Sequence, residues 1–105
     1  MSEKVVPFRE VGPAHALKLI RQLEQESKPI GLSKHARLTM RQRKVSWPQI
    51  RHVIRSGKAV EGPYQDHGGH WICRLEGHAA GKNVAVVAKM EDEERLKLVT
   101  VIDLK

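Results

Sequence analysis

Residues 33–57 read SKHARLTMRQRKVSWPQIRHVIRSG, and this stretch contains two helix starts and one clear stop. Ser33 is a good helix N-cap. The second start, Ser46-Trp-Pro-Gln49, has the residues of a capping box with proline in the first turn. We therefore predict one helix from Ser33 to about residue 43, and another from Ser46 that ends at Gly57 in a left-handed C-cap.

The segment before this stretch predicts an additional helix and an arm. From residue 14 to about 26, apolar side chains recur at helical spacing, with Pro13 suited to the first turn and Pro29 placed after the end. Residues 1–12, which contain Pro7 and Gly12, are predicted to form an arm without regular structure.

After Lys58 the apolar residues alternate, as is typical of strands. The predicted strands cover residues 59–65, 70–76, 83–90 and 95–104, and the short turns between them favour antiparallel hairpins. One face of the last strand is expected to carry Leu96, Leu98, Ile102 and Leu104, and the other Val99 and Val101. The predicted fold is α+β, with two to three N-terminal helices packed on one face of a four-stranded antiparallel β-meander. Residues 1–105 then form a single domain, with a basic helical half (14–57) and a sheet half (58–105).

Composition is typical of a soluble chain in a reducing compartment. The protein has 105 residues, of which 40% are apolar and 30% charged, and this suits one domain with its own core. The single cysteine, Cys73, excludes an intrachain disulfide. There is neither a secretory signal nor a run of about 18 apolar residues. We therefore expect a cytoplasmic protein that does not enter a membrane.

Positive charge is concentrated in the first half of the chain. Residues 1–57 carry 12 Lys and Arg against 4 Asp and Glu, whereas residues 58–105 carry 7 against 8. No acid occurs between Ser27 and Val60, and that window holds nine cations: Lys28, Lys34, Arg37, Arg41, Arg43, Lys44, Arg51, Arg55 and Lys58. Because like charges repel, this excess predicts an anionic partner, unless the acids of residues 91–94 fold back over it.

Six of these cations are predicted to form the contact surface. Lys34, Arg37, Arg41 and Lys44 stand at i, i+3, i+7 and i+10, so they make one stripe along their helix. Arg51 and Arg55 are one turn apart and are expected to point outward from the next helix. RNA or another polyanion is the expected partner, and an acidic protein is the alternative.

The same region resembles a bacterial family known as domain of unknown function 4258, over roughly residues 32–103. The family pattern Ser-x-His-Ala-x-x-Arg-Met-x-x-Arg-x-Ile-Ser is matched by Ser33, His35, Ala36, Met40, Arg43, Val45 and Ser46. Thr39 stands where the pattern has arginine, and the strand at residues 84–88 lacks a histidine found in many members. The resemblance implies, at the level of architecture, the small ribonuclease toxins typified by RelE, with helices on a four-stranded antiparallel sheet. It also implies an antitoxin as the acidic protein partner.

His35, Thr39 and Arg43 recur every four residues and share one side of their helix. RNA cleavage without a metal needs a base, an acid and cations for the developing phosphorane charge. His35 is the candidate for proton transfer, and Arg43 and Arg74 are candidates for binding phosphate oxygens. Alternatively, His35 is a hydrogen-bonded wedge between helix and strand, and Arg43 ties the helix end to a carbonyl or to Asp103.

No metal and no cofactor is expected. His67, His70 and Cys73 are spaced by three, so neighbouring members face opposite sides of a strand and complete no tetrahedral set. Cys73 lies between Trp71 and Leu75 in a pattern that indicates burial.

Three hypotheses follow for function. The first is a metal-independent endoribonuclease of toxin type, and the second is a non-catalytic nucleic-acid-binding module that uses the same stripe. The third is an interaction domain whose basic surface docks an acidic protein. The sequence does not fix the RNA target or the oligomeric state.

Overall fold

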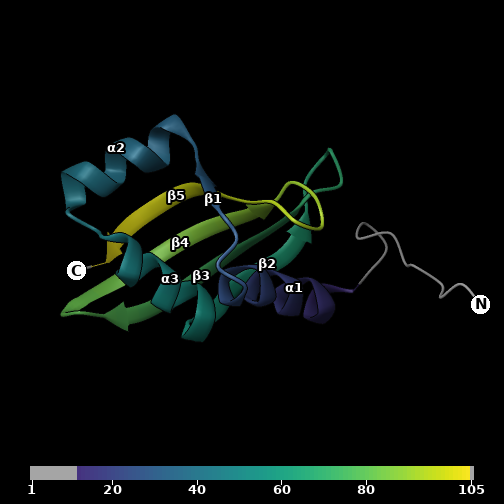
Figure 1. Cartoon of the computed structure of the whole chain (residues 1–105), viewed down its shortest axis with the longest axis horizontal. Coiled ribbons are helices and arrows are strands. Elements are labelled where there is room, and N and C mark those ends of the chain that lie inside the picture. The colour runs from purple at the N-terminus through teal and green to yellow at the C-terminus, as the bar shows by residue number, and fades with distance from the viewer. Residues whose placement is uncertain (1–11, 105) are drawn as a thin grey trace, which may run out of the picture.

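A computed structural model describes residues 12–104 of the chain and shows an α+β fold within them (Figure 1). In chain order the elements are α1 (Pro13–Gln25), β1 (Ile30–Leu32), α2 (Lys34–Arg43), α3 (Trp47–Ser56), β2 (Lys58–Gln65), β3 (Trp71–Ala79), β4 (Lys82–Met90) and β5 (Leu96–Leu104). The three predicted helices and the four long predicted strands are all present, with ends shifted by a few residues. The predicted arm of residues 1–12 lies, apart from Gly12, outside the described residues.

The sheet of the described chain differs from the prediction in having five strands and mixed direction. Its strand order is β1-β5-β4-β3-β2, and β1 pairs with β5 in parallel, with Ile30 opposite Leu96 and Leu32 opposite Leu98. The other pairs are antiparallel, as predicted. The prediction of a purely antiparallel four-stranded meander was therefore wrong, because a three-residue strand leaves no alternating pattern to recognise.

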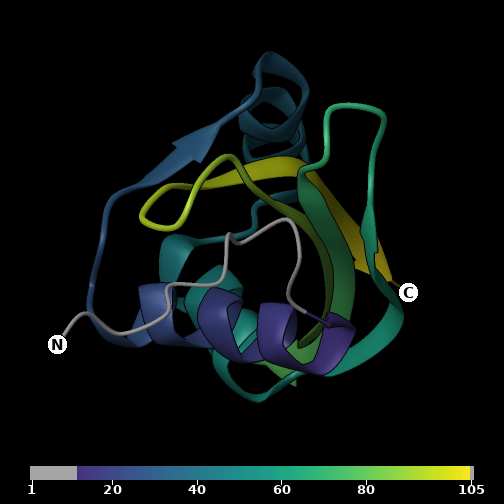
Figure 2. The same ribbon diagram turned by 90° about the vertical axis from the view of Figure 1, so that its right-hand side faces the viewer.

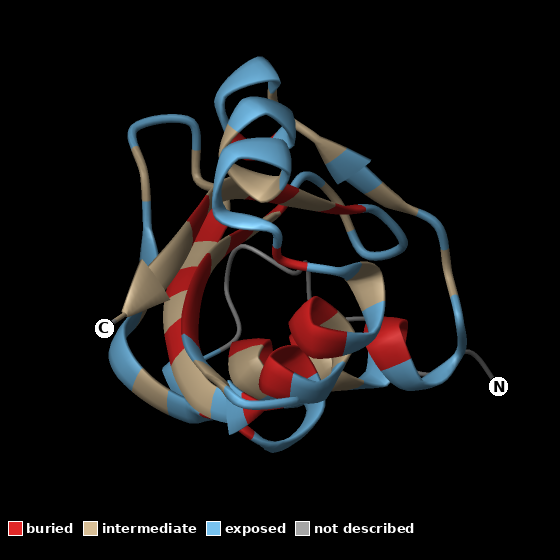
Figure 3. Cartoon of the chain, turned by 90° about the vertical axis from the view of Figure 1, so that its left-hand side faces the viewer, coloured by how far each residue is buried: buried red, intermediate tan, exposed pale blue. Residues whose placement is uncertain are grey.

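One core lies between the helices and one face of the sheet (Figure 3). Cys73 and Leu75 of β3 and Val86 of β4 are fully buried there, beneath Ile50 and Ile54 of α3. Helix α1 adds Ala16, Ile20 and Leu23, and α2 adds Ala36. Residues of all three helices therefore join the same core, as the predicted helix packing on one face requires.

A β-bulge at Val99 changes which of the following residues of β5 face the core. Ala88 of β4 pairs with Leu98, but the next residue, Val87, pairs with Thr100, so Val99 is the extra residue. Val101 therefore returns to the core side and is fully buried like Leu98. The predicted placement of Val101 opposite Leu96 and Leu98 was wrong, since a bulge shifts the alternation by one position.

The bulge also supports the start of α2. The backbone N–H of Ser33 donates to the carbonyl of Leu98 at 3.0 Å, and the Ser33 hydroxyl donates to the carbonyl of Val99 at 2.8 Å. The same hydroxyl accepts from the N–H of Ala36 at 2.9 Å, which confirms Ser33 as the N-cap. Figures 1 and 2 show α2 at the β1–β5 end of the molecule, away from α1 and α3. Because β1 pairs with only three residues of β5, α2 packs against the rest of that strand.

Helix α3 begins with the predicted capping box and ends differently from the prediction. Ser46 and Gln49 exchange the expected hydrogen bonds. Gly57 is extended, with φ −73° and ψ 167°, and not left-handed. A Cβ atom at Gly57 would lie 2.4 Å from the Val53 carbonyl oxygen and 2.8 Å from that of Glu76. Glycine is required at position 57 because the helix end approaches β3 too closely for a side chain. The predicted left-handed C-cap was therefore wrong.

Candidate nucleic-acid interface

The outward side of α2 carries cations without acidic partners. Lys34, Arg37, Arg41 and Lys44 are all exposed. None of them forms an ion pair within residues 12–104, and the acids of residues 91–94 do not pair with them. We call these four residues the α2 stripe. The stripe matches the sequence prediction and gives an uncompensated positive surface.

Arg51 and Arg55 differ from the α2 stripe, because both of them pair with Glu24 of α1. Arg55 Nε lies 2.9 Å from Glu24 Oε1, and Arg51 Nη1 lies 3.6 Å from Glu24 Oε2. Glu24 is only 4% exposed. Its hydrogen bond and charge raise the pKa of Arg55. The expectation that no acid lies near the nine cations was therefore wrong at α3. Glu24 precedes the acid-free window in the sequence, but the packing of α1 against α3 places it beside Arg51 and Arg55.

Arg51 also lies over the ring of Trp47, with its guanidinium carbon 5.9 Å from the ring centroid. Trp47 is half-buried against the core. The Arg51 guanidinium therefore covers part of the accessible face of the Trp47 ring in a cation–π contact.

His35, Thr39 and Arg43 line one cleft, as their spacing predicted. This cleft, of about 450 Å³, runs between α2 and residues 100–103 of β5. We call it the α2–β5 cleft. The His35 side chain is exposed, and the Thr39 hydroxyl donates within α2 to the His35 backbone carbonyl at 2.8 Å. An exposed ring does not act as a wedge between helix and strand, so the anchoring alternative for His35 was wrong.

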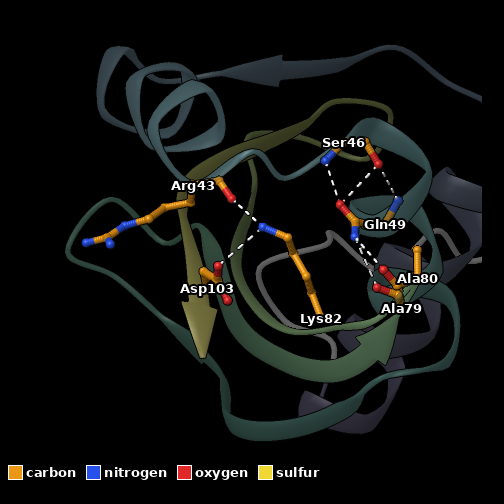
Figure 4. Close-up of polar contacts among 7 residues, drawn as sticks. All are labelled: Arg43, Ser46, Gln49, Ala79, Ala80, Lys82 and Asp103. Carbon is orange, nitrogen blue, oxygen red and sulfur yellow. Dashed lines mark hydrogen bonds and ion pairs between the residues drawn. The ribbon is translucent and has the colours of Figure 1, made fainter. Parts of the chain in front are cut away.

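The end of α2 is fixed by Lys82 and not by the guanidinium of Arg43 (Figure 4). Lys82 Nζ donates to the Arg43 carbonyl at 2.6 Å and lies 3.4 Å from Asp103 Oδ2. The Arg43 side chain points away from both groups (Figure 4). The alternative in which Arg43 itself ties the helix end was therefore wrong, and its guanidinium is exposed at the rim of the cleft.

Arg74 is not brought into this cleft. It lies on β3, in the cross-strand row that continues through Val87 of β4 to Thr100 of β5. Two strand spacings of about 4.8 Å separate its backbone from the cleft. Its guanidinium pairs with Glu76, with Nε 3.0 Å from Oε2. The structure thus unites two of the three predicted catalytic residues and leaves the third on another part of the sheet.

Asp103 is a cleft residue that we did not assign to the site from the sequence. It lines the α2–β5 cleft opposite His35 and Arg43, and it pairs with Lys82. A signal was available: Lys82 has the same parity on its strand as Val84 and Val86, which face the core. A cation at such a position calls for a buried or half-buried acid nearby.

Cys73 does not contribute chemistry to the surface. It is fully buried in the core, and desolvation raises the pKa of its thiol to about 11 despite the charge of Arg21. The thiol stays protonated at neutral pH, so it is not a nucleophile. Within residues 12–104, no three His, Cys, Asp or Glu side chains gather as metal ligands would.

No helix in the described part of the chain has the length and apolar character that crossing a membrane requires. Comparison with known proteins gives one finding: residues 32–103 match the family described as domain of unknown function, DUF4258. No curated protein and no solved structure was found to match. The matched residues include the last residue of β1, all of α2, α3, β2, β3 and β4, and nearly all of β5, and therefore both the α2 stripe and the α2–β5 cleft. The chain belongs to the DUF4258 family.

Proposed function

We propose that this protein binds RNA through the α2 stripe. The observation that carries the proposal is the contrast between helices: the four stripe cations have no acidic partner in residues 12–104, whereas Arg51 and Arg55 of α3 share Glu24. Ten residues separate the first and last stripe cations, which corresponds to about 15 Å of helix. A row of this kind suits a polyanion with regularly spaced charges better than a single acidic group.

Arg43 adds a fifth cation beside the stripe, because its guanidinium is exposed and has no ion-pair partner among the described residues. Five phosphate contacts to a single strand give a slope of about −3.5 for log affinity against log salt. Raising the salt from about 50 to 200 mM should then weaken binding by about a hundredfold. A flat salt response would reject nucleic-acid binding.

The assignment to α2 is tested by two charge-matched double variants. K34Q/K44Q removes two stripe lysines, and K18Q/K58Q removes two exposed lysines from α1 and β2. We expect K34Q/K44Q to reduce the salt slope by about 1.4, since each lost phosphate contact removes about 0.7. K18Q/K58Q should bind as the wild type does in fluorescence anisotropy with a labelled oligoribonucleotide. Equal losses in both variants would show that net charge, and not α2, governs binding.

A second candidate function is metal-independent RNA cleavage in the α2–β5 cleft. It is supported by the shared position of His35, Arg43 and Asp103, which supply an imidazole, a fixed cation and a carboxylate to one cleft. Histidine suits proton transfer near neutral pH, and arginine suits the charge that develops on phosphorus. The RelE-like ribonuclease activity implied by the resemblance belongs to this candidate, with Thr39 in the place of the family's arginine.

Cleavage is tested by incubating labelled RNA with the purified protein in EDTA. We expect His35→Ala to abolish cutting, while His67→Ala, which removes an exposed histidine from the turn between β2 and β3, leaves cutting in place. Cutting that persists in His35→Ala would remove this histidine from the mechanism. Binding without any cutting would leave the chain as a non-catalytic binding module.

An acidic protein segment, such as an antitoxin tail, carries the same sign of charge as RNA and is the competing partner. The ratio of absorbance at 260 and 280 nm of the purified sample separates the two. Copurified nucleic acid raises the ratio, whereas a bound acidic protein leaves it at the value for protein.

A further inference from the structure

A second cleft, of about 440 Å³, lies where the first turns of α3 meet the turn between β3 and β4. We call it the α3 cleft. Its lining is mostly apolar, with Pro48 on one side and Ala79 and Ala80 on the other. The exposed His52 of α3 completes it, whereas the ring of His78 points to the other face of the sheet, because His78 alternates with the buried Ala79 along β3. A cleft of this size with aromatic and apolar walls is suited to a flat ligand.

Hydrogen bonds hold both walls of this cleft in place. Gln49 is 6% exposed, and its side-chain amide donates to the carbonyl of Ala79 at 3.1 Å (Figure 4). The same side chain belongs to the capping box with Ser46. The Gln49 amide also lies 3.5 Å from the carbonyl of Ala80, so it ties α3 to the turn between β3 and β4. The site is therefore built before any ligand arrives, and little ordering accompanies binding.

The α3 cleft continues directly from the α2 stripe. Lys44, the last stripe residue, is two positions before Ser46, which lines the cleft. Two residues span no more than about 7 Å. Lys82, the first residue of β4, holds this corner together by donating to the Arg43 carbonyl at the end of α2. A strand bound along α2 thus reaches the cleft without leaving the protein surface.

We propose that the α3 cleft takes one unstacked base of single-stranded RNA, stacked against His52. This inference rests on the proposed RNA binding by α2 and specifies its substrate. The stripe supplies contacts to phosphates, which every nucleic acid offers, and the cleft supplies a contact that requires a base free of its neighbours. Every base has a flat face, so recognition is tolerant of sequence.

Double-stranded RNA cannot use this cleft, because its bases are paired and stacked inside the helix. The protein should therefore prefer a single strand to a duplex of the same length at the same salt concentration. We expect about a tenfold preference, which is the gain from one stacked base.

The experiment compares a labelled single strand, its duplex and an abasic strand of equal length, each titrated with full-length wild type, His52→Ala and the control His67→Ala. His67 is also exposed but lies in the turn between β2 and β3, away from the cleft. We expect His52→Ala to bind the single strand about tenfold more weakly and the duplex and abasic strand as the wild type does. His67→Ala should match the wild type on all three probes, and circular dichroism melting checks that each variant folds.

The outcomes separate this inference from the proposed function. If the wild type binds neither strand nor duplex, RNA binding itself is wrong. If the wild type binds single strand and duplex equally, or if His52→Ala keeps full affinity for the single strand, the base-binding cleft is wrong while the α2 stripe stands. A loss on the abasic strand equal to that on the single strand would also overturn the cleft, since no base is present to stack.

Discussion

The hydroxyl of Ser33 and the carbonyl of Val99 are joined by a hydrogen bond of 2.8 Å, so the first residue of the α2 cap is attached to the bulge of β5. The bulge turns the Val99 carbonyl toward the helix, and the same hydroxyl caps the helix by accepting from Ala36. One side chain therefore determines both where α2 begins and where it sits on the sheet.

The first prediction concerns this contact. Ser33→Ala should lower the free energy of unfolding by about 1–2 kcal/mol, because it removes an N-cap together with the bond to Val99. Urea unfolding followed by circular dichroism measures the change. The control is Ser56→Ala, since Ser56 is exposed in the last turn of α3. If the two variants have equal midpoints, the Ser33 contacts contribute nothing to stability.

The second prediction concerns Glu24. Glu24→Gln removes the carboxylate that neutralises Arg51 and Arg55, and we expect it to lower stability and to make two more cations available to RNA. The salt slope of RNA binding should steepen by up to about 1.4, from two contacts of about 0.7 each. Glu26→Gln, which removes the same charge from an exposed position, is the control. An unchanged slope in Glu24→Gln would show that α3 stays outside the bound strand.

The third prediction concerns the junction of α3 and β2. Gly57→Ala should destabilise the fold by about 2 kcal/mol or more, because its Cβ would meet two backbone carbonyl oxygens that cannot move independently. Gly31→Ala is the matched control, since its Cβ would make only ordinary contacts of 3.8 Å and longer. A midpoint for Gly57→Ala within error of that for Gly31→Ala would contradict the close approach.

The fourth prediction concerns Asp66, in the turn between β2 and β3. Its carboxylate accepts from the N–H groups of His70 and Gly68, each at 2.9 Å, and it also lies near Lys89. The backbone bond from His70 is the main cause that lowers the pKa of Asp66 below its ordinary 3.8. A lowered pKa in the folded state gives stability that is fully present above the ordinary value and is lost as the pH falls through the folded value.

Asp66→Asn should therefore flatten the acid limb of the stability curve below about pH 4, with little further change in pH dependence above it. Melting temperatures from pH 2 to 7 test this. Asp92 provides the comparison, because the N–H of Glu94 is the main cause that lowers its pKa. Asp92→Asn should also reduce the loss of stability at acidic pH, independently of Asp66→Asn. Parallel curves for the wild type and Asp66→Asn would refute the proposed linkage.

Much of the fold could be predicted because its signals are local. The caps at Ser33 and Ser46 are confirmed, and the alternation along β3 and β4 correctly placed Cys73 in the core. Strand β1 was not predicted because its three residues are identifiable as a strand only through their pairing with β5. The bulge at Val99 likewise exists only in the register between β4 and β5, and no residue in the sequence marks it.

The candidate site divides in the same way. The α2 stripe and the shared side of His35 and Arg43 follow from helical spacing, so the sequence predicted them. The neutralisation of Arg55 by Glu24 depends on how α1 crosses α3, which spacing along one helix does not determine. Arg74 was grouped with His35 on chemistry alone, and the strand order places it two strands from the cleft.

The bond between Ser33 and Val99 spans 66 positions of the chain. Helix α2 has ten residues, fewer than the roughly 12–15 that an isolated helix needs to hold its shape in water. During synthesis the basic side chains are therefore complete long before the strand that organises them is made. A proteolytic cut ahead of β5 would disorganise the α2 stripe without removing any of the residues that form it.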